Sequence, residues 1–499
     1  MLYIDAPTRV RIPKADVSDI QLQQLKAGLT YTNKTAVFEL SRLKKQARWM
    51  TEEEYQEKQD ALKAQTKVCL LFEDANDYWT YSGLANFVAG TLRQSIQNNI
   101  QYPEPKLLPW DNEPPFAMRP YQEEICDKLL QCKHGGVSVG TGLGKTLALT
   151  HLVKRLGLKT VVMAPSKSIA DQIYDDFVKF FGKKRVGKFY DGKKDVKKQI
   201  LVCTGQSLTR VEEGEIWSKL QEVQVFIADE SHQTPAATFK KVCLGPLAAA
   251  QYRFFFSATQ MRNDGADILL EGITGPIVYD MTVRQGVDQG FLAKPIFHMY
   301  FAPSNGDYDK DDPQLMTRKH LYFHPKVTAH AAKLANQAAT AGLPCLILVD
   351  EVEQFTKLLP HLRFAPGFAH GPLAENKARV PQEFWESDPN DLVQKFNDGK
   401  IPILVGTSCI STGTDIKAVK FLIYLKGGKS EIEVKQGIGR GTRLVPGKTV
   451  CHVIDYWVKS PTAELLKNDG KWWTVGAHAK ERKAIYNDLY GPVIEEGDI

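Results

Sequence analysis

The sequence predicts an α/β protein in which two tandem domains, each a parallel sheet flanked by helices, follow a smaller α/β domain. Three observations lead to this prediction. Short apolar runs alternate with helical patterns between residues 109 and 295, the same alternation recurs between residues 296 and 460, and residues 1–108 carry apolar and helical patterns of their own. Strands that alternate with helices are typical of parallel sheets, because each crossover helix covers a face of the sheet.

The N-terminal accessory domain is expected to span residues 1–108. A helical pattern runs from Ile20 to Leu29, and the apolar run from Val68 to Phe72 indicates a strand. Prolines between positions 103 and 115 predict a stiff linker to the next domain. A basic stretch inside this domain contains Arg42, Lys44, Lys45, Arg48 and Trp49. This stretch is either a solvated helical face or a surface that contacts phosphates.

The first larger domain, residues 109–295, has strand-like runs at 160–163, 199–203, 223–228 and 252–256. One connecting region is crowded with cations: Lys183, Lys184, Arg185, Lys188, Lys193, Lys194, Lys197 and Lys198. We interpret this region either as a solvated loop or as a rim that follows a phosphate backbone.

A glycine-rich loop, VGTGLGKT from Val139 to Thr146, lies in this domain between an apolar run and a helical pattern. Its glycines let backbone N–H groups point at phosphate oxygens, Lys145 can reach the β- and γ-phosphates, and the Thr146 hydroxyl can ligate Mg²⁺. Val139 stands where the usual pattern has its first glycine. That difference changes the match to the motif and leaves the chemistry intact.

Two adjacent carboxylates, Asp229 and Glu230, end the apolar run that begins at Phe226. A carboxylate at the end of a strand can hold Mg²⁺ through water, and its neighbour can polarise an attacking water. Acidic pairs also occur in solvated turns. A phosphate loop a few βα units earlier favours the catalytic interpretation.

The second larger domain, residues 296–460, has probable strands at 345–349, 403–405 and 420–425 and no phosphate loop. Two segments rich in glycine, proline and charge, Ala302 to Pro325 and Arg363 to Asp391, interrupt it. They are expected to be surface loops, or one of them presents Tyr322 and Phe323 as an aromatic wedge. Residues 461–499 predict a helical appendage packed by Trp472 and Trp473, with an acidic end.

Bulk properties limit the class of protein. The chain has 499 residues, 43% of them apolar, and a formal net charge of +6, which predict several folded domains and only local nucleic-acid surfaces. Eight scattered cysteines without a C-x-x-C pair indicate reduced packing residues. The chain has no apolar run long enough for a membrane span and no basic segment before an apolar start, so we expect a cytoplasmic protein, in the host cytoplasm if it is viral.

In their order along the chain, the motifs resemble those of superfamily 2 helicases and translocases of the DExH kind, from about Met118 to Tyr456. This resemblance implies two RecA-like motor domains. It assigns ATP binding to Arg119, Gln122, Gly140, Thr141, Gly142, Leu143, Gly144, Lys145, Thr146, Gly413 and Asp415. The implied catalytic residues are Lys145, Asp229, Glu230, Gln436, Arg440 and Arg443, the last two acting as arginine fingers from the second motor domain.

The same resemblance implies the other roles. Thr146 and Asp229 would hold Mg²⁺, and Gln122 would contact the adenine base. Contacts to nucleic acid are assigned to Pro165, Ser166, Lys167, Thr204, Gln206, Ser207 and Thr407, and coupling of hydrolysis to nucleic acid to His232, Ser257, Ala258 and Thr259. Two positions depart from the pattern. Gln260 stands where proline is common, and Ser231, in the Asp-Glu-x-His box, does not choose between DNA and RNA.

The function expected from these residues is an ATP-dependent DNA helicase or translocase acting on branched DNA. The segment from Arg119 to Gln122, the Asp-Glu-x-His box and the segment from Gln289 to Pro295 are similar to phage helicases that reanneal and branch-migrate DNA, the UvsW kind. Beside such a motor, the basic stretch becomes a candidate contact for duplex or branched DNA. An RNA helicase, or the motor or sensor subunit of a restriction-type complex, is the alternative. The expected partners are single-stranded, duplex or branched DNA, with RNA possible in principle, no membrane, and protein partners left open.

Overall fold

A computed structural model describes residues 1–231, 234, 236–257, 267–309, 312–410, 416–445, 447–463, 465 and 473–499. The side chains of residues 45, 48, 236, 267, 374–376, 408 and 432 are not described. The chain divides into two compact units. Unit 1 comprises Met1–Val139 and Gly144–Asp280, and unit 2 comprises Gly140–Leu143 and Met281–Ile499.

The N-terminal part of unit 1 is a five-stranded sheet in the order β5-β6-β2-β1-β7. Its strands are β1 (Leu2–Ala6), β2 (Arg9–Pro13), β5 (Phe72–Glu73), β6 (Asp77–Tyr81) and β7 (Ile96–Asn98), and all but the β1–β7 pair are antiparallel. Helices α1 (Asp19–Gly28) and α4 (Ala85–Leu92) pack on one another. A capping box between Ser18 and Gln21 begins α1 and confirms the predicted helix.

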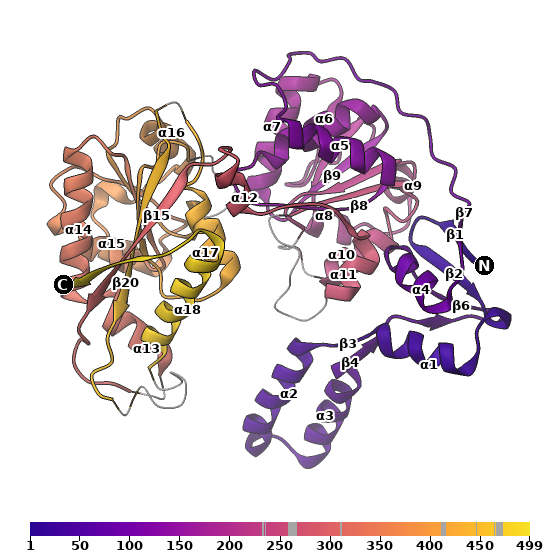
Figure 1. Cartoon of the computed structure of the whole chain (residues 1–499), viewed down its shortest axis with the longest axis horizontal. Coiled ribbons are helices and arrows are strands. Elements are labelled where there is room, and N and C mark those ends of the chain that lie inside the picture. Colours follow the sequence, from indigo (N-terminus) through magenta and orange to yellow (C-terminus); the bar gives the residue numbers. More distant parts are fainter. Residues whose placement is uncertain are drawn as a thin grey trace. The chain divides into compact units, whose positions relative to one another are not determined.

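A helical arm extends from this part of the chain (Figure 1). The antiparallel ribbon of β3 (Thr30–Thr32) and β4 (Lys67–Cys69) carries α2 (Lys34–Gln46) and α3 (Glu52–Thr66), which pack on one another. Asn33 and Thr51 cap the two helices. The single strand predicted at 68–72 is therefore wrong: its first residues belong to this ribbon, and Phe72 belongs to the larger sheet, because the chain leaves the ribbon between them.

The segment after β7 runs along the first large domain. Lys106 N donates to Leu156 O at 2.8 Å, and Leu108 N donates to Lys154 O at 2.9 Å. These backbone hydrogen bonds hold the proline-rich segment against the first large domain. The small and large domains of unit 1 also share one apolar core. It joins Tyr81 and Leu84 to Leu270 and to Ile273 of α11 (Asp267–Thr274).

The first large domain has a seven-stranded sheet in the order β10-β11-β9-β12-β13-β8-β14, as the sequence predicts. The strands are β8 (His134–Val139), β9 (Thr160–Ala164), β10 (Val186–Phe189), β11 (Ile200–Thr204), β12 (Val225–Ala228), β13 (Tyr252–Ser257) and β14 (Ile277–Met281). All strand pairs from β10 to β8 are parallel. The central strands are buried along their whole length, which explains their continuous apolar runs.

The helices of this domain are α5 (Pro120–Cys132), α6 (Lys145–Leu156), α7 (Lys167–Phe181), α8 (Gly205–Thr209), α9 (Glu215–Gln221), α10 (Ala236–Leu244) and α11. Helix α12 (Val283–Asp288), which follows β14, belongs to unit 2. Helix α8 begins directly after β11. Helices α6 and α7 begin after short loops at the carboxyl ends of β8 and β9. The side chains that start these helices therefore gather at one edge of the sheet.

The second large domain also has a seven-stranded sheet, in the order β17-β18-β16-β19-β20-β15-β21. Its strands are β15 (Lys294–Ala302), β16 (Cys345–Val349), β17 (Gly367–Ala369), β18 (Ile403–Gly406), β19 (Phe421–Leu425), β20 (Val450–Val458) and β21 (Ile494–Asp498), and every pair is parallel. Its helices are α13 (Pro313–Thr317), α14 (Pro325–Thr340), α15 (Val352–Leu358), α16 (Pro389–Asn397), α17 (Glu431–Gly439) and α18 (Thr474–Leu489). The predicted fold class of two parallel-sheet domains behind a small α/β domain is confirmed.

Both segments expected to be surface loops contribute to this domain. The second contains β17, whose Phe368 stacks on Phe355 with ring centroids 3.9 Å apart. In the first, the Tyr322 hydroxyl donates to Asp350 Oδ2 at 2.5 Å, so the expected aromatic wedge has its tyrosine fastened to the domain. The tail is partly helical, as expected, with Trp473 buried beside α18. Its acidic end is instead the edge strand β21, paired with β15. Trp472 lies outside the described residues.

Candidate functional site

The predicted catalytic lysine begins α6. Lys145 follows Gly144, whose φ of 75° lies in the left-handed region that glycine adopts without strain. The Lys145 ammonium donates to Val139 O at 3.2 Å and lies 3.2 Å from Glu230 Oε1. Only 9% of Lys145 is exposed. The strand–loop–helix geometry thus fixes one cation at the loop, beside one of the two predicted carboxylates.

The carboxylate pair follows β12, as predicted. Asp229 is 6% exposed, and its Oδ1 accepts a hydrogen bond from Glu230 N at 3.0 Å. Burial, and next the Glu230 charge, raise the pKa of Asp229 well above its usual range. Glu230 has a φ of 45°, which is rare for a residue with a side chain. Such a conformation persists where the surrounding structure imposes it, and it is often found at functional sites.

These features fit a nucleotide with a divalent cation. A buried carboxylate with a raised pKa is poorly compensated by the protein alone, so a cation beside it would stabilise its ionised form. Thr146 lies in the first turn of α6, next to Lys145. The residues that the sequence assigns to Mg²⁺, Thr146 and Asp229, thus follow the carboxyl ends of β8 and β12, which are separated in the sheet by β13.

Gln122 has a structural role that the sequence did not reveal. Its Nε2 donates to Gly144 O at 3.0 Å, and its Oε1 accepts from Arg119 N at 2.8 Å. The side chain is buried, and a Cβ at Gly144 would lie 2.7 Å from its amide nitrogen. Gln122 therefore holds the phosphate loop in place. Its assigned contact with adenine stays a prediction.

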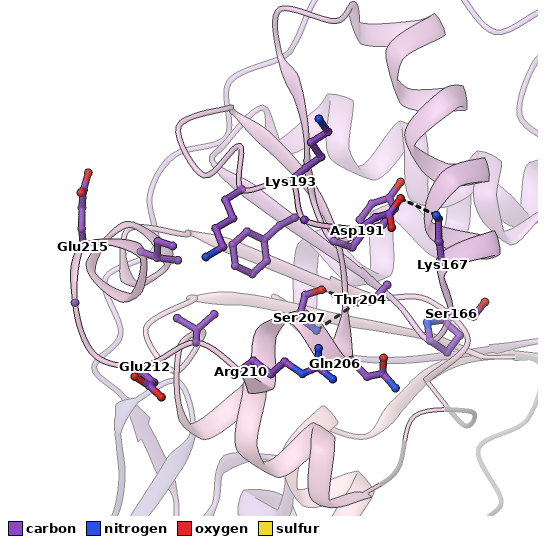
Figure 2. A pocket seen from close by; sticks show the side chains of 18 residues that line it. Ser166, Lys167, Asp191, Lys193, Thr204, Gln206, Ser207, Arg210, Glu212 and Glu215 are labelled. Carbon is purple, nitrogen blue, oxygen red and sulfur yellow. Dashed lines mark hydrogen bonds and ion pairs between the residues drawn. The ribbon is translucent and has the colours of Figure 1, made fainter.

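The residues of the first large domain that are predicted to contact nucleic acid share one groove of about 1060 Å³ at the carboxyl ends of β9, β10 and β11. Figure 2 shows Ser166, Lys167, Thr204, Gln206 and Ser207 around it. Pro165 lines it as well. Ser166 caps α7 and Thr204 caps α8, so backbone N–H groups at two helix starts also lie at this edge.

Other residues of the groove were missed or only partly anticipated. Arg210 and Asp191 line it together with Lys193 and Lys194, which the sequence placed in a lysine-rich rim. Figure 2 shows Lys167 and Asp191 pointing toward each other, and Lys167 Nζ lies 2.6 Å from Asp191 Oδ2. Asp191 has a φ of 54° and Gly192 a φ of 76°, a turn that an Asp-Gly pair favours. That dipeptide is the signal that could have located the loop.

The predicted residues of the second large domain lie in two places. Thr407 follows β18, and its N donates to Ala369 O at 3.1 Å. Gln436 lies on α17, Arg440 ends that helix and is buried, and Arg443 follows in the next turn. Burial lowers the pKa of Arg443 to about 10, so its guanidinium stays charged at neutral pH.

Several predicted residues cannot be placed. Ser257 ends β13 and is buried, whereas Ala258 and Thr259 lie outside the described residues. The same holds for His232, Gly413 and Asp415, and for Gln260.

The basic stretch of the N-terminal part lies on the arm. Arg42 and Lys44 are exposed on α2, and Arg42 Nη1 lies 3.2 Å from Glu39 Oε1. The backbones of Lys45 and Arg48 follow on the same helix and the turn after it. Two aromatic side chains accompany them: Phe38 is 61% exposed and Trp49 is 78% exposed.

None of the helices in the described part of the chain is apolar for a length that crosses a bilayer.

Comparisons with known proteins follow the same division of the chain. Residues 115–262 match the family described as type III restriction enzyme, res subunit, and residues 344–445 match the helicase conserved C-terminal domain. The DNA 3'-5' translocase XPB2 of Sulfurisphaera tokodaii is 22% identical over 415 residues, 76% of this chain and 88% of that protein. Probable helicase D10 of Escherichia phage T5 is 23% identical over 384 residues, 73% and 78% of the two chains. The crystal structure of UvsW from phage T4 covers 100% of this chain and 99% of its own, at 15% identity and a TM-score of 0.43.

Proposed function

We propose that this superfamily 2 helicase acts on branched DNA, where it unwinds, reanneals or branch-migrates junctions during recombination, repair or replication. Its class is the premise of the proposal: the two helicase-type domains and the named helicase relatives make the chain an ATP-dependent helicase or translocase. What is proposed is the branched substrate, the roles of individual residues, and action in the cytoplasm, or in a host's cytoplasm.

The α2–α3 arm carries this proposal. Phe38 and Arg42 are four residues apart on α2, so they share one face of that helix, and Trp49 ends the 3₁₀ turn that follows α2. The side chains of Phe38 and Trp49 are more exposed than is usual for large apolar groups. Exposed aromatics flanking a cation suit stacking on unpaired bases with a neighbouring phosphate contact. Unpaired bases beside duplex are what a fork presents, and a four-way junction presents them where base pairs open at its branch point.

The ATP chemistry follows from the residues already described. In this proposal Lys145, which lies beside Glu230, binds the β- and γ-phosphates and Glu230 orients the attacking water. Thr146 and Asp229 would hold Mg²⁺, which would neutralise phosphate charge. Lys167, Thr204 and Ser207 line the groove around Lys167, and in this proposal they bind a nucleic-acid backbone there. Gln436, Arg440 and Arg443 keep the roles that the resemblance gives them.

The proposal is tested on the arm by replacing both aromatics, Phe38→Ala with Trp49→Ala. Stacking on a base is worth about 1–3 kcal/mol, so affinity for forks and four-way junctions should fall about tenfold or more. Phe116→Ala is the matched control, because Phe116 is 70% exposed and lies outside the arm. ATPase stimulated by single strands should not change. Equal affinities of the double variant and the control for a four-way junction would contradict the proposal.

The same assay separates the alternatives. An RNA helicase would show stronger ATPase stimulation by RNA forks than by DNA forks of the same sequence. A restriction-type motor would be stimulated by linear duplex as strongly as by junctions. We include this second alternative because residues 115–262 match the res-subunit family of type III restriction enzymes.

A further inference from the structure

Cationic side chains also gather at the opposite edge of the first large sheet, where the strands begin. Strands β10, β11, β9 and β12 are neighbours, and their first residues Val186, Ile200, Thr160 and Val225 stand in register. The residues just before these strands are therefore aligned in one row. That row contains Lys184 with Arg185, then Lys198 with Gln199, then Lys159, then Gln224.

A groove of about 640 Å³ runs beside this row. Lys106, Lys159, Lys197 and Lys198 line it, with Glu104, Gln199 and Gln224. Hydrogen bonds bring the next loop to it, since Lys198 Nζ donates to Lys184 O at 3.0 Å. Lys183 and Lys184 are thereby held beside the groove. We call Lys106, Lys159, Lys183, Lys184, Lys197 and Lys198 the rear lysines.

Most of the charge of the rear lysines is not neutralised by the protein. Lys159 is paired with Glu222 at 2.8 Å, and Lys198 is bonded to backbone carbonyls. Within the part of the chain that the structure describes, no ion pair involves Lys106, Lys183, Lys184 or Lys197, and these four side chains are exposed. Glu104 is the carboxylate that lines the groove. The surface therefore keeps a cationic excess.

The backbone beneath the groove is fixed. Lys106 N donates to Leu156 O, and a Cβ at Gly157 would lie 1.5 Å from Lys106 O, so glycine allows the two chains to approach. Gln199 Nε2 donates to Gly157 O at 2.9 Å, and Gln224 Oε1 accepts from Lys159 N at 3.2 Å. Four segments of the chain are thus held together around the lysines.

This surface is separate from the groove at the carboxyl ends of the same strands. Lys159 and Pro165 flank β9, and at about 3.3 Å per residue they lie roughly 20 Å apart. A ligand at the rear lysines would not fill the groove around Lys167.

We propose that the rear lysines bind the phosphate backbone of a DNA duplex, as a second contact of this helicase with its substrate. The four aligned strand starts span about 14 Å, over which a duplex presents on the order of eight phosphates. Among the described residues that line the groove, none is aromatic, so nothing there suits stacking on the bases of a single strand. The ligand is thus recognised by its charge and not by its sequence.

The test replaces Lys106, Lys183, Lys184 and Lys197 by alanine together. Binding of a blunt duplex without ATP is measured across a salt series. Each phosphate contact contributes about 0.9 to the slope of log affinity against log salt, so four lost contacts should lower the slope by roughly 3.6. The matched control replaces Lys128, Lys333, Lys357 and Lys400, which changes the net charge equally outside the groove. A slope equal to the control's overturns the proposal.

Lysine acetylation read by mass spectrometry gives a direct second measurement on the wild-type protein. Duplex DNA should protect Lys106, Lys183, Lys184 and Lys197 from the reagent. If these four lysines are acetylated equally with and without bound duplex, the proposal is overturned. The remaining candidate ligand for this cationic surface would then be an acidic protein. Because the duplex has no branch, either result leaves the junction-binding role of the arm to its own experiment.

Discussion

Glu230 combines a catalytic assignment with a left-handed backbone, and its carboxylate lies 3.2 Å from the Lys145 ammonium. Glu230→Gln keeps the size of the side chain and removes its ability to polarise water, whereas Lys145→Ala removes the cation that we propose binds the phosphates. Each change should lower nucleic-acid-stimulated ATPase about 10²-fold or more, because each deletes a positioned group that acts in the transition state.

The measurement is steady-state ATPase with saturating single-stranded DNA. Glu124→Gln is the control for a carboxylate lost elsewhere in unit 1, because Glu124 is exposed on α5 and lines neither groove. Rates within about threefold of wild type for both Lys145→Ala and Glu230→Gln would disprove these assignments.

Asp229 gives a prediction about pH. Its pKa is raised in the folded protein, so the stability it contributes is present below the usual pKa of an aspartate and is lost as the pH rises through the raised value. Asp229→Asn removes the buried charge. Without nucleotide and Mg²⁺, this variant should melt at a temperature about 2 °C or more above wild type at pH 8.

The melting difference for Asp229→Asn should shrink between pH 8 and pH 5, where the wild-type carboxyl takes up its proton. Scanning calorimetry at several pH values checks this, with ATPase recorded as a separate loss of function. A difference that grows toward acid would show that the sign is wrong.

At the level of residues, the sequence located the glycine-rich loop and the carboxylate pair because each is a contiguous motif at a strand end. It missed the bond from Gln122 to Gly144 because 22 positions separate these residues, and only the fold brings them together. The Lys167–Asp191 pair was missed for the same reason. Residue type and spacing carry local chemistry and leave nonlocal partners unspecified.

Helix α18 is locked to β20 by a buried ion pair. Arg482 donates two hydrogen bonds to Asp455, both at 2.8 Å, and each side chain is at most 2% exposed. Tyr486 also donates to Asp455, at 2.7 Å. Arg482→Met would leave a buried carboxylate without its cation, which should destabilise unit 2 by about 3–5 kcal/mol.

Urea unfolding followed by tryptophan fluorescence measures this loss. Lys480→Met is the control, because Lys480 is an exposed residue of the same helix. A loss below about 1 kcal/mol for Arg482→Met would mean that the ion pair does not anchor α18.

The elements that sequence patterns predicted are the fully buried strands and the long helices. β17 was missed because it has three residues in a segment rich in glycine, proline and charge. β21 was missed because its residues, Ile494–Asp498, are all exposed and therefore show no apolar pattern in the sequence. Backbone pairing with β15 defines this strand. The arm was predicted only as a basic helix, since its ribbon strands are three residues each.

For the molecule as a whole, unit 1 should unfold as one body. Tyr81 and Leu84 of the small domain share a core with Leu270 and Ile273 of the large domain. Truncation of residues 1–108 would expose this apolar face of α11 and should therefore destabilise the first large domain.

Hydrogen exchange during mild denaturation tests that cooperativity. Peptides from β1 and β2 should lose protection together with peptides from β9 and β11. Earlier loss of protection in β1 and β2 would indicate two independent folding units.

The resemblance to superfamily 2 helicases implies that ATP hydrolysis requires residues of both units. Arg443 keeps its charge, since its pKa falls only to about 10. Arg443→Ala should bind ATP with affinity within about threefold of wild type and turn over about 10²-fold more slowly, because an arginine finger acts mainly in the transition state.

Comparing nucleotide affinity with kcat separates these effects, and Arg379→Ala serves as an exposed control in unit 2. Weakened ATP binding with normal turnover would argue against a finger role for Arg443.

The rear lysines and the groove around Lys167 stand at opposite ends of β9, β10 and β11. If DNA is held at both places, a pulling force between the two contacts would act along the length of these strands. Lengthwise pulling loads the hydrogen bonds between neighbouring parallel strands together, in shear, and does not open them one after another. The sheet would then serve as the tension-bearing part of the motor, with its stiffest direction aligned with the load.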